Sequence, residues 1–283
     1  MAQNSSIEWT DHTFNPWWGC SKVSPACNNC YAELWAKRMG HRVWGAAAER
    51  RFFSDAHWQE PLGWNDEARG SRRRKRVFCA SMADVFERRA ELHEHRERLW
   101  ELIEATPWLD WLLLTKRPQN ISEMVPWKRN WPKNVWLGTT VENQLYAERR
   151  LPFLLDNASV VRFLSCEPLL GALDLTAWFR KRGFHPIDWV IAGGESGPKS
   201  RPMHPDWAVS LLYQCQKAKV PFHFKQWGHW APTNAIVENV PAQILKLAEE
   251  RPVKMVALGK KAAGRLLEGA TWNGLPRPIA AYA

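Results

Sequence analysis

The segment WLLLTKRP, residues 111–118, shows the pattern on which the fold prediction rests: a short apolar run, then two cations and a proline. Short runs rich in β-branched or aromatic residues are typical of buried strands. Six such runs occur, at Val77–Ala80, Trp111–Thr115, Val135–Thr139, Val160–Leu164, Trp189–Ala192 and Phe222–Phe224. Several are separated by stretches of helical pattern, at Ala90–Ala105, Asn143–Leu155 and Pro205–Lys219.

This alternation predicts an α/β fold with parallel strands joined by crossovers. Six strands suit a full or partial (β/α) barrel, and a doubly wound open sheet is the alternative. We expect one domain over residues 1–283, with a cysteine-rich segment at 1–40, a β/α core at 77–228 and a C-terminal extension at 229–283. A helix is expected at Tyr31–Met39, whereas residues 41–75 look irregular.

Composition limits the class of protein. The chain has 283 residues, of which 45% are hydrophobic, and no apolar run reaches the length of a membrane span. Its first residues have neither the basic start nor the apolar stretch of a signal peptide, so we expect a cytoplasmic protein that does not bind membranes. Lys and Arg outnumber Asp and Glu by 39 to 29, and the net charge of +10 favours an anionic partner, nucleic acid above all.

Polar residues follow nearly every predicted strand. In β/α barrels the catalytic groups lie just past the carboxyl ends of the strands, so these positions predict a substrate-facing rim. The residues there are Ser81 and Asp84, Lys116 and Arg117, Thr140 and Glu142, Ser165, Cys166 and Glu167, Glu195 and Ser196, and Lys225 and Gln226.

Three of the six cysteines are clustered. Six residues separate Cys20 from Cys27, and two separate Cys27 from Cys30. Three thiolates leave one iron of a four-iron cluster free to bind a cofactor, whereas structural zinc usually takes four ligands. His12 and His41 are near enough in sequence for a Cys3His zinc site to stay an alternative, and thiols that merely pack in the loop are a weaker one.

The cysteine spacing resembles the motif of radical S-adenosylmethionine enzymes, although the usual motif has three residues rather than six in its first gap. Together with residues 81–86, 165–171, 193–198, 224–228 and 259–265, it closely resembles the phage Gp37/Gp68-like family, a domain of unknown function. The resemblance covers nearly the whole chain. That family is in turn similar to radical S-adenosylmethionine enzymes such as spore photoproduct lyase.

The resemblance implies a [4Fe-4S] cluster on the three cysteines, S-adenosylmethionine, and an electron donor such as flavodoxin or ferredoxin. It implies a DNA repair lyase that splits UV-induced pyrimidine dimers through a 5′-deoxyadenosyl radical. A damaged base pair costs less to flip out of the duplex than an intact one. Radical modification of an RNA base or a peptide is one alternative, and a zinc-stabilised nucleic-acid-binding protein without catalysis is another.

Several side chains are expected to contact the cofactor or the substrate. The expected cofactor ligands are Tyr31, Ser81, Asp84, Glu142, Gly193, Gly194, Glu195 and Ser196. Glycines after a strand let the backbone approach a ligand, although a plain turn has the same pattern. The expected catalytic residues are Lys116, Glu167 and Cys166. For Lys116 and Glu167 a surface charge is the alternative, and for Cys166 packing is the stronger interpretation because free cysteines are usually buried.

Basic residues, some of them interleaved with the 19 tryptophans, predict contact with nucleic acid. They are the run Arg72, Arg73, Arg74, Lys75 and Arg76, the pair Lys128 and Arg129 between Trp127 and Trp131, and Arg117 and Lys225. Solvated surface charge is the alternative for these residues.

Overall fold

A computed structural model describes residues 2–5, 7–197, 199–232 and 252–276. Its main feature is an eight-stranded sheet in which spatial order follows sequence order from β1 to β8. The strands β2 to β8 are all parallel, and β1 runs antiparallel to β2. The bounds are β1 (Ala2–Gln3), β2 (His12–Thr13), β3 (Lys75–Cys79), β4 (Leu109–Thr115), β5 (Val135–Thr140), β6 (Val161–Cys166), β7 (Trp189–Gly193) and β8 (Phe222–Gln226).

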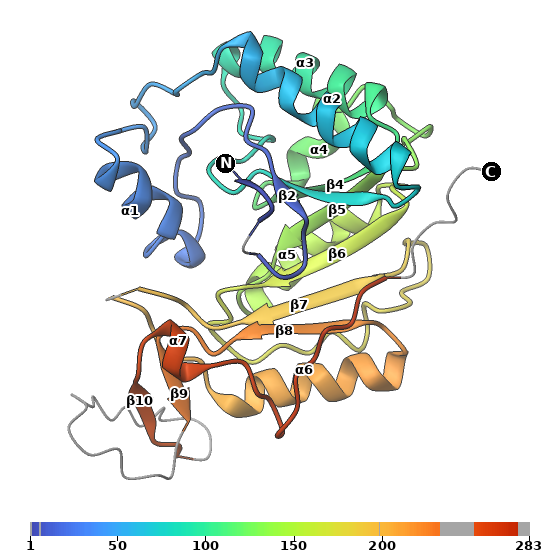
Figure 1. The fold of residues 1–283 in the computed structure, drawn as a ribbon. Coiled ribbons are helices and arrows are strands. Elements are labelled where there is room, and N and C mark those ends of the chain that lie inside the picture. The colour runs from blue at the N-terminus through green and yellow to red at the C-terminus, as the bar shows by residue number, and fades with distance from the viewer. Residues whose placement is uncertain (1, 6, 198, 233–251, 277–283) are drawn as a thin grey trace.

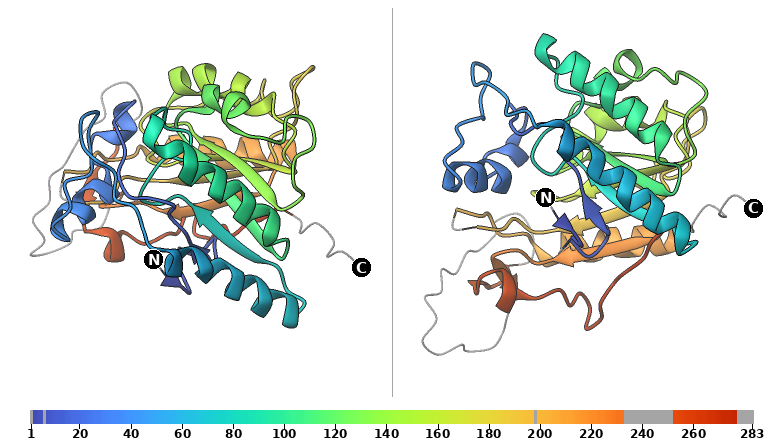
Figure 2. Two further views of the ribbon diagram at one scale, coloured as in Figure 1. Left: turned by 90° about the horizontal axis from the view of Figure 1, so that it is seen from above. Right: turned by 45° about the horizontal axis from the view of Figure 1, so that its top comes forward.

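The sheet is curled into a half-barrel (Figures 1 and 2). Because the strand order never reverses, the partial β/α barrel is confirmed and the doubly wound sheet is wrong. All six predicted strands are present, with ends close to those expected. A further pair, β9 (Trp230–Pro232) and β10 (Met255–Ala257), forms a separate antiparallel sheet.

Helices cover the outer face of the sheet (Figure 2). Alternate strand residues such as Leu113, Leu137 and Leu164 share one large core with helix residues such as Leu151 and Leu211. The helices are α1 (Tyr31–Arg38), α2 (Asp55–Gly70), α3 (His93–Ala105), α4 (Ile121–Met124), α5 (Gln144–Leu155), α6 (Pro205–Ala218) and α7 (Lys260–Ala263). Of these, α1, α3, α5 and α6 confirm the four helices that the sequence predicts.

A second apolar cluster fills the inner face of the half-barrel. Phe78, Trp136, Phe163 and Trp189 come from four different strands and pack there with Trp9, which lies in the segment before β2. The Trp9 ring contacts Phe78 at a centroid distance of 4.8 Å and Trp189 at 6.1 Å. Trp9 therefore bridges β3 and β7 across the inner face.

The expectation that residues 41–75 are irregular is wrong over Asp55–Gly70, which forms α2. Pro61 and Gly63 inside this segment argue against a helix. The helix is stabilised by a buried stripe at helical spacing, formed by His57, Trp58, Pro61, Trp64, Asn65 and Ala68. Burial of this stripe outweighs the weak local preference for a helix.

Parts of the expected C-terminal extension, residues 233–251 and 277–283, and Pro198 of the glycine-rich motif lie outside the described residues. The described part of the extension contributes β9, β10 and α7. In the described residues no helix combines the length and the apolar character needed to cross a bilayer.

Candidate functional site

The cysteines lie in a loop that follows β2 and runs along the carboxyl ends of the parallel strands. We call residues 19–30 the cysteine loop. It begins beside the end of β3, where the backbone N–H of Gly19 donates to the carbonyl of Met82 at 3.0 Å. Directly after the loop, the hydroxyl of Tyr31 donates to the carbonyl of Ser81 at 3.2 Å. The loop therefore starts and finishes at the same strand end.

Two other strand ends also hold the cysteine loop. After β4, Arg117 donates to the carbonyl of Ser21 at 2.8 Å and to its hydroxyl at 2.9 Å. After β7, Glu195 accepts a hydrogen bond from the side chain of Asn29 at 2.9 Å. The loop thus spans the mouth of the half-barrel from β3 to β7.

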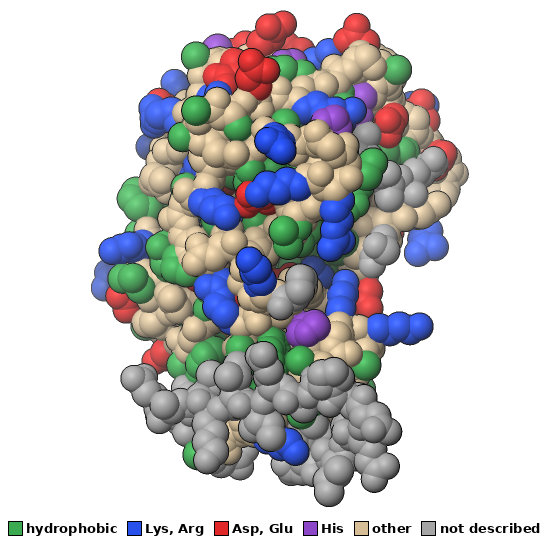
Figure 3. All heavy atoms as spheres, turned by 90° about the vertical axis from the view of Figure 1, so that its left-hand side faces the viewer, with side chains coloured by type: hydrophobic (Ala, Val, Ile, Leu, Met, Phe, Trp, Pro, Cys, Tyr) green, Lys and Arg blue, Asp and Glu red, His purple; other side chains and the backbone are tan. Residues whose placement is uncertain are grey.

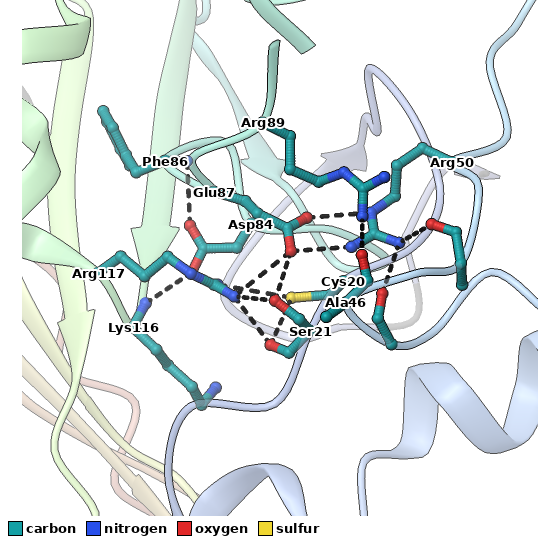
Figure 4. A network of polar contacts seen from close by, with 12 residues as sticks. Cys20, Ser21, Ala46, Arg50, Asp84, Phe86, Glu87, Arg89, Lys116 and Arg117 are labelled. Carbon is teal, nitrogen blue, oxygen red and sulfur yellow. Dashed lines mark hydrogen bonds and ion pairs between the residues drawn. The ribbon is translucent and has the colours of Figure 1, made fainter. Parts of the chain in front are cut away.

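A network of buried charges lies beneath the start of the loop (Figure 4). Arg50 pairs with Glu87 at 2.9 Å, and Arg117 pairs with Asp84 at 2.8 Å, with all four side chains buried. Ser21 joins the two pairs because its hydroxyl donates to Glu87 and accepts from Arg117. A buried ion that loses its partner destabilises a fold strongly, so these four residues fix one another in place.

Cys20 belongs to this network as well. Nη1 of Arg117 donates to its Sγ at 3.6 Å. Burial raises the pKa of the Cys20 thiol to about 12, and the Arg117 guanidinium opposes that rise. Burial also raises the pKa of Cys30, while backbone N–H groups in the first turn of α1 and the ammonium of Lys116 oppose it. Positive partners therefore stand beside two of the three sulfur atoms.

The three thiols of the cysteine loop are candidate metal ligands, and the structure shows their state. All three are free and partly exposed. Within the described residues, no three His, Cys, Asp or Glu side chains come together closely enough to hold one ion. A tetrahedral zinc site, with bonds of ~2.3 Å to sulfur, needs its ligand atoms within roughly 4 Å of one another. A cluster of four irons is larger and holds its thiolates farther apart.

Neither histidine that the zinc alternative needs is placed as a fourth ligand. The ring of His12 is buried and stacks on Trp64 at 4.6 Å, and the ring of His41 lies edge-on to Trp18 at 5.6 Å. In the part of the chain that the structure describes, neither belongs to a group of metal-binding side chains with the cysteines.

Asp84, one of the three carboxylates predicted to bind the cofactor, is buried and fully engaged within the protein. It accepts from the Thr115 hydroxyl, the Arg117 guanidinium and the backbone N–H groups of Phe86 and Lys116. Burial acts to raise its pKa, but the guanidinium and the other donors outweigh it and lower the pKa. The carboxylate is therefore ionised, and it holds the segments after β3 and β4 together.

The other two predicted carboxylates have internal partners as well. Glu142 is fully buried and pairs with Arg150 at 2.7 Å. Glu195 has both oxygens engaged, by Arg201 and Asn29, and Arg201 also donates to a carbonyl of the cysteine loop at 2.9 Å. All three carboxylates are thus bonded to arginines of the protein and are not open to a ligand. A contact with the cofactor would require them to exchange these partners.

Gly193 is the last residue of β7 and Gly194 follows it, and the two glycines differ in role. A Cβ on Gly194 would lie 1.9 Å from the carbonyl oxygen of Trp227, so this glycine allows close packing of neighbouring segments. Gly193 lies beside Glu167, and a Cβ added to this glycine would lie 3.6 Å from the carboxylate carbon. For Gly194 the plain turn interpretation fits best.

The two serines predicted to bind the cofactor also make internal contacts. The Ser196 hydroxyl accepts from the side chain of Gln226 at 2.9 Å, and the Ser81 hydroxyl accepts from that of Asn15 at 3.1 Å. Both side chains are partly exposed. A hydroxyl in this position can still bond a ligand with its remaining capacity.

Three charged side chains remain at the mouth. Glu167 and Lys225 form an ion pair of 2.7 Å in which each side chain keeps 19% of its exposure. Lys116 is half-buried, and its ammonium points away from the buried network to which its backbone is bonded (Figure 4). Tyr31 is 56% exposed. These groups are the accessible polar surface of the site, and Lys116 is close enough to Cys30 to oppose the rise that burial causes in the pKa of its thiol.

Cys166 is fully buried in the core between the sheet and the helices. Burial raises the pKa of its thiol well above the usual value, and Cys215 of α6 adds to that rise. This placement fits the packing interpretation, because it puts the thiol on the outer face of β6, away from the inside of the half-barrel.

Most of the predicted nucleic-acid residues lie at the opposite end of the barrel. The run that begins at Arg72 leads into β3, and Lys128 and Arg129 precede β5, so both groups are at the amino ends of the strands. Trp127 and Trp131 are buried, at 7% and 8% exposure. These two rings pack in the core and offer no surface on which a base could stack.

Several of the predicted cations already have carboxylate partners. Arg74 is paired with Asp110, and Arg76 with Asp11. At the mouth, Arg117 is paired with Asp84, which follows the neighbouring strand β3, and Lys225 of β8 is paired with Glu167, which follows β6. Charge alone therefore overstates how many of these side chains are free to meet a phosphate.

Sequence reasoning missed a basic pocket beside the cysteine loop. The pocket has a volume of about 540 Å³ and lies between the loop, the segment after β3, the end of β4 and α5. The face of the molecule to which β7 and β8 point carries many Lys and Arg side chains (Figure 3). The sequence contains one sign of this pocket: basic residues follow two of the strands, Arg88 after β3 and Lys116 after β4. The pocket is lined by Arg88, Arg89, Lys116, Tyr146, Arg149 and Phe153, among others.

A comparison with curated proteins and with solved structures found no match. A family described as "Protein of unknown function (DUF5131)" matches residues 4–276. This confirms the expectation of an uncharacterised family whose likeness extends over nearly the whole chain. The match covers the cysteine loop, the half-barrel and the strand ends that hold the loop, and the chain belongs to this DUF5131 family.

Proposed function

We propose that this chain is a radical S-adenosylmethionine enzyme that acts on nucleic acid. The observation that carries the proposal is the position of the cysteine loop, which three strand ends fix across the mouth of a parallel half-barrel. In β/α barrels this end of the strands is where active sites are built. Free thiols in such a place are better explained by a metal centre than by packing.

In this proposal Cys20, Cys27 and Cys30 hold a [4Fe-4S] cluster. When bound there, such a cluster would supply one-electron reduction of S-adenosylmethionine, with the electron coming from an external donor, and so hydrogen-atom abstraction from a substrate. Arg117 keeps Cys20 in position through its bond to the sulfur atom.

Three side chains at the mouth are suited to hold the cofactor. Lys116 and Lys225 are cations able to bind a carboxylate near the thiols, and Lys116 is close enough to Cys30 to influence its pKa. Glu167 is the accessible carboxylate, able to accept from an amino group. An amino acid moiety needs this combination of charges.

Anaerobic reconstitution with iron and sulfide tests the metal centre. We expect about four irons per chain, a brown protein, and 5′-deoxyadenosine on addition of dithionite and S-adenosylmethionine. The variant Cys20→Ala/Cys27→Ala/Cys30→Ala is expected to lose both iron and product. The matched control Cys215→Ala removes a buried thiol of α6 and is expected to keep them. Stoichiometric zinc with no cleavage of S-adenosylmethionine would overturn the proposal.

The finer proposal is a lyase that repairs UV-induced pyrimidine dimers. Reconstituted enzyme is incubated with UV-irradiated and with plain DNA oligonucleotides, and the products are analysed by mass spectrometry. Repair predicts restored monomeric pyrimidines in the irradiated strand and no change in the plain one. Equal products from both strands would contradict repair, and modification of an RNA oligonucleotide or a peptide alone would favour those substrates.

A further inference from the structure

The basic pocket beside the cysteine loop contains cations that are free to bind an anion. Arg149 is exposed and Lys116 half-buried, and neither forms an ion pair with another described residue. Arg88 is paired with Glu123, but the two side chains are 61% and 60% exposed. The pair is bidentate, but water reaches both side chains, so a phosphate can compete with Glu123 for the Arg88 guanidinium.

The cations come from three separate elements. Arg88 follows β3, Lys116 follows β4 and Arg149 lies on α5. Cations spread in this way suit several phosphates along a chain better than one small anion. Phe153, one turn after Arg149 on α5, is 48% exposed and supplies a ring for stacking.

We propose that this pocket binds a nucleic-acid strand with unpaired bases, with phosphates on Arg88 and Arg149 and a base stacked on Phe153, while Lys116 at its edge is left to the cofactor. The inference rests on the proposed function and states how the enzyme holds its substrate. Ser21 and Val23 of the cysteine loop line the pocket, so a strand bound there passes directly beside the thiols. The basic residues at the amino ends of the strands then have no part in substrate binding.

Fluorescence anisotropy with labelled dT10 and rU10 tests the pocket. Binding is measured before and after reconstitution, so a failure of the cluster chemistry leaves this measurement intact. We expect Phe153→Ala to weaken binding at least about fivefold, since stacking of one base contributes that much. We expect Arg149→Gln to weaken binding and to reduce the slope of log Kd against log salt by about 0.7, the value for one lost phosphate contact on a single strand.

The matched control is Lys128→Gln/Arg129→Gln, which removes two exposed cations at the opposite end of the barrel. It is expected to bind both oligonucleotides as the wild type does. The inference is overturned if this control loses the affinity while Arg149→Gln and Phe153→Ala keep it, or if the wild type binds neither oligonucleotide. Competition by inorganic phosphate at equal phosphate concentration would also overturn it, because the pocket would then be a site for a small anion.

Discussion

At the scale of single residues, the site is held by charges that the fold has removed from water. Arg50 and Glu87 keep 0% and 4% of their side-chain exposure, and they are 37 positions apart in the chain. Arg50 also donates to the carbonyls of Val43, Gly45 and Ala48, so one guanidinium orders the segment after α1. Buried pairs of this kind are weak evidence for net stability. Here they fix the arrangement of the cysteine loop.

His223 on β8 gives a prediction about pH. Burial and the cations Arg265, Lys225 and Arg76 lower its pKa from 6.5 to about 4, and its nearest carboxylate, Glu8, lies 3.9 Å away, beyond hydrogen-bond distance. Between pH 4 and 6.5 the unfolded chain binds a proton that the folded chain does not, so the free energy of unfolding rises with pH. This histidine accounts for roughly 3 kcal/mol of that rise, at about 1.36 kcal/mol per pKa unit.

Urea unfolding between pH 4 and 7 checks this prediction. In His223→Phe we expect a smaller rise of the unfolding free energy with pH, because the proton-binding group is gone. His93→Phe is the control, since that side chain is 71% exposed and should leave the pH dependence unchanged. Identical pH dependence in His223→Phe and the wild type would show that His223 titrates normally in the folded chain.

The sequence predicts the cysteine loop well and the carboxylates poorly. The spacing of Cys20, Cys27 and Cys30 is local, and the structure places all three at the mouth with free thiols. Whether Asp84 faces solvent depends instead on which cation reaches it. Arg117 is 33 positions away, and no local pattern shows that it turns inward. A position at the end of a strand predicts where in the fold a side chain lies. Whether that side chain is buried depends on partners far away in the sequence.

At the scale of elements, the strands could be predicted because each is a short apolar run that is buried on both faces. The helix α2 could not, because Pro61 and Gly63 lower its local preference while its stability comes from packing of Trp58 and Trp64. The strand β2 has two residues and leaves no sequence pattern at all. Elements that depend on tertiary contacts are the ones that sequence reasoning missed.

Gly138 in β5 shows how closely the inner face is packed, and it gives a prediction about stability. A Cβ at this position would lie 2.4 Å from ring atoms of Phe163 on the neighbouring strand. We therefore expect Gly138→Ala to lower the free energy of unfolding by about 1–3 kcal/mol, the usual effect of overpacking. Denaturant unfolding measures the change.

Two further variants separate this clash from a general effect of alanine. Gly63→Ala adds the same methyl group on α2, where nothing lies within 4 Å, and we expect a gain of about 0.5–1 kcal/mol from better helix propensity. In Gly138→Ala/Phe163→Leu the smaller side chain leaves room, so the double variant should lose less than the sum of the single ones. Additive losses would mean that the two residues do not interact.

At the scale of the whole molecule, the half-barrel has two sheet edges that must be protected. An exposed edge strand invites pairing with another chain. At the β8 edge, residues 272–274 return and bond the strand. The carbonyl of Trp272 accepts from the backbone N–H of Phe224 at 2.9 Å, and Gly274 donates to the carbonyl of Phe222 at 2.9 Å. This segment therefore occupies backbone groups that the edge would otherwise present to solvent.

The same segment reaches the inner core, where the indole of Trp189 donates to the carbonyl of Gly274 at 2.8 Å. Arg265 meanwhile pairs with Glu8 of the N-terminal segment. The two sides of the open barrel are thus tied together by Trp9 on the inside and by Glu8 and Arg265 at the edge. Among the described residues, β1 and β8 do not pair with each other, so the barrel is open between them. Side-chain contacts, rather than strand pairing, hold these two sides together.

Removal of this returning segment gives a prediction about the whole molecule. A chain that stops after Ala270 loses the three hydrogen bonds that join Trp272 and Gly274 to β7 and β8. At ~1 kcal/mol for each bond, we expect the free energy of unfolding to fall by about 3 kcal/mol. We also expect self-association through β8, seen by light scattering, and faster amide exchange in Phe222–Gln226.

Because the truncated chain risks misfolding, Gly274→Ala tests the same contact in the full chain. Its Cβ would lie 2.6 Å from the backbone of Phe222, so the returning segment has to move away from β8 and amide exchange in β8 should become faster. Gly70→Ala is the matched control, because the same methyl group there meets nothing within 4 Å and should leave that exchange unchanged. Unchanged exchange in Gly274→Ala would mean that the returning segment does not protect the edge, and that β8 is stabilised by its pairing with β7 alone.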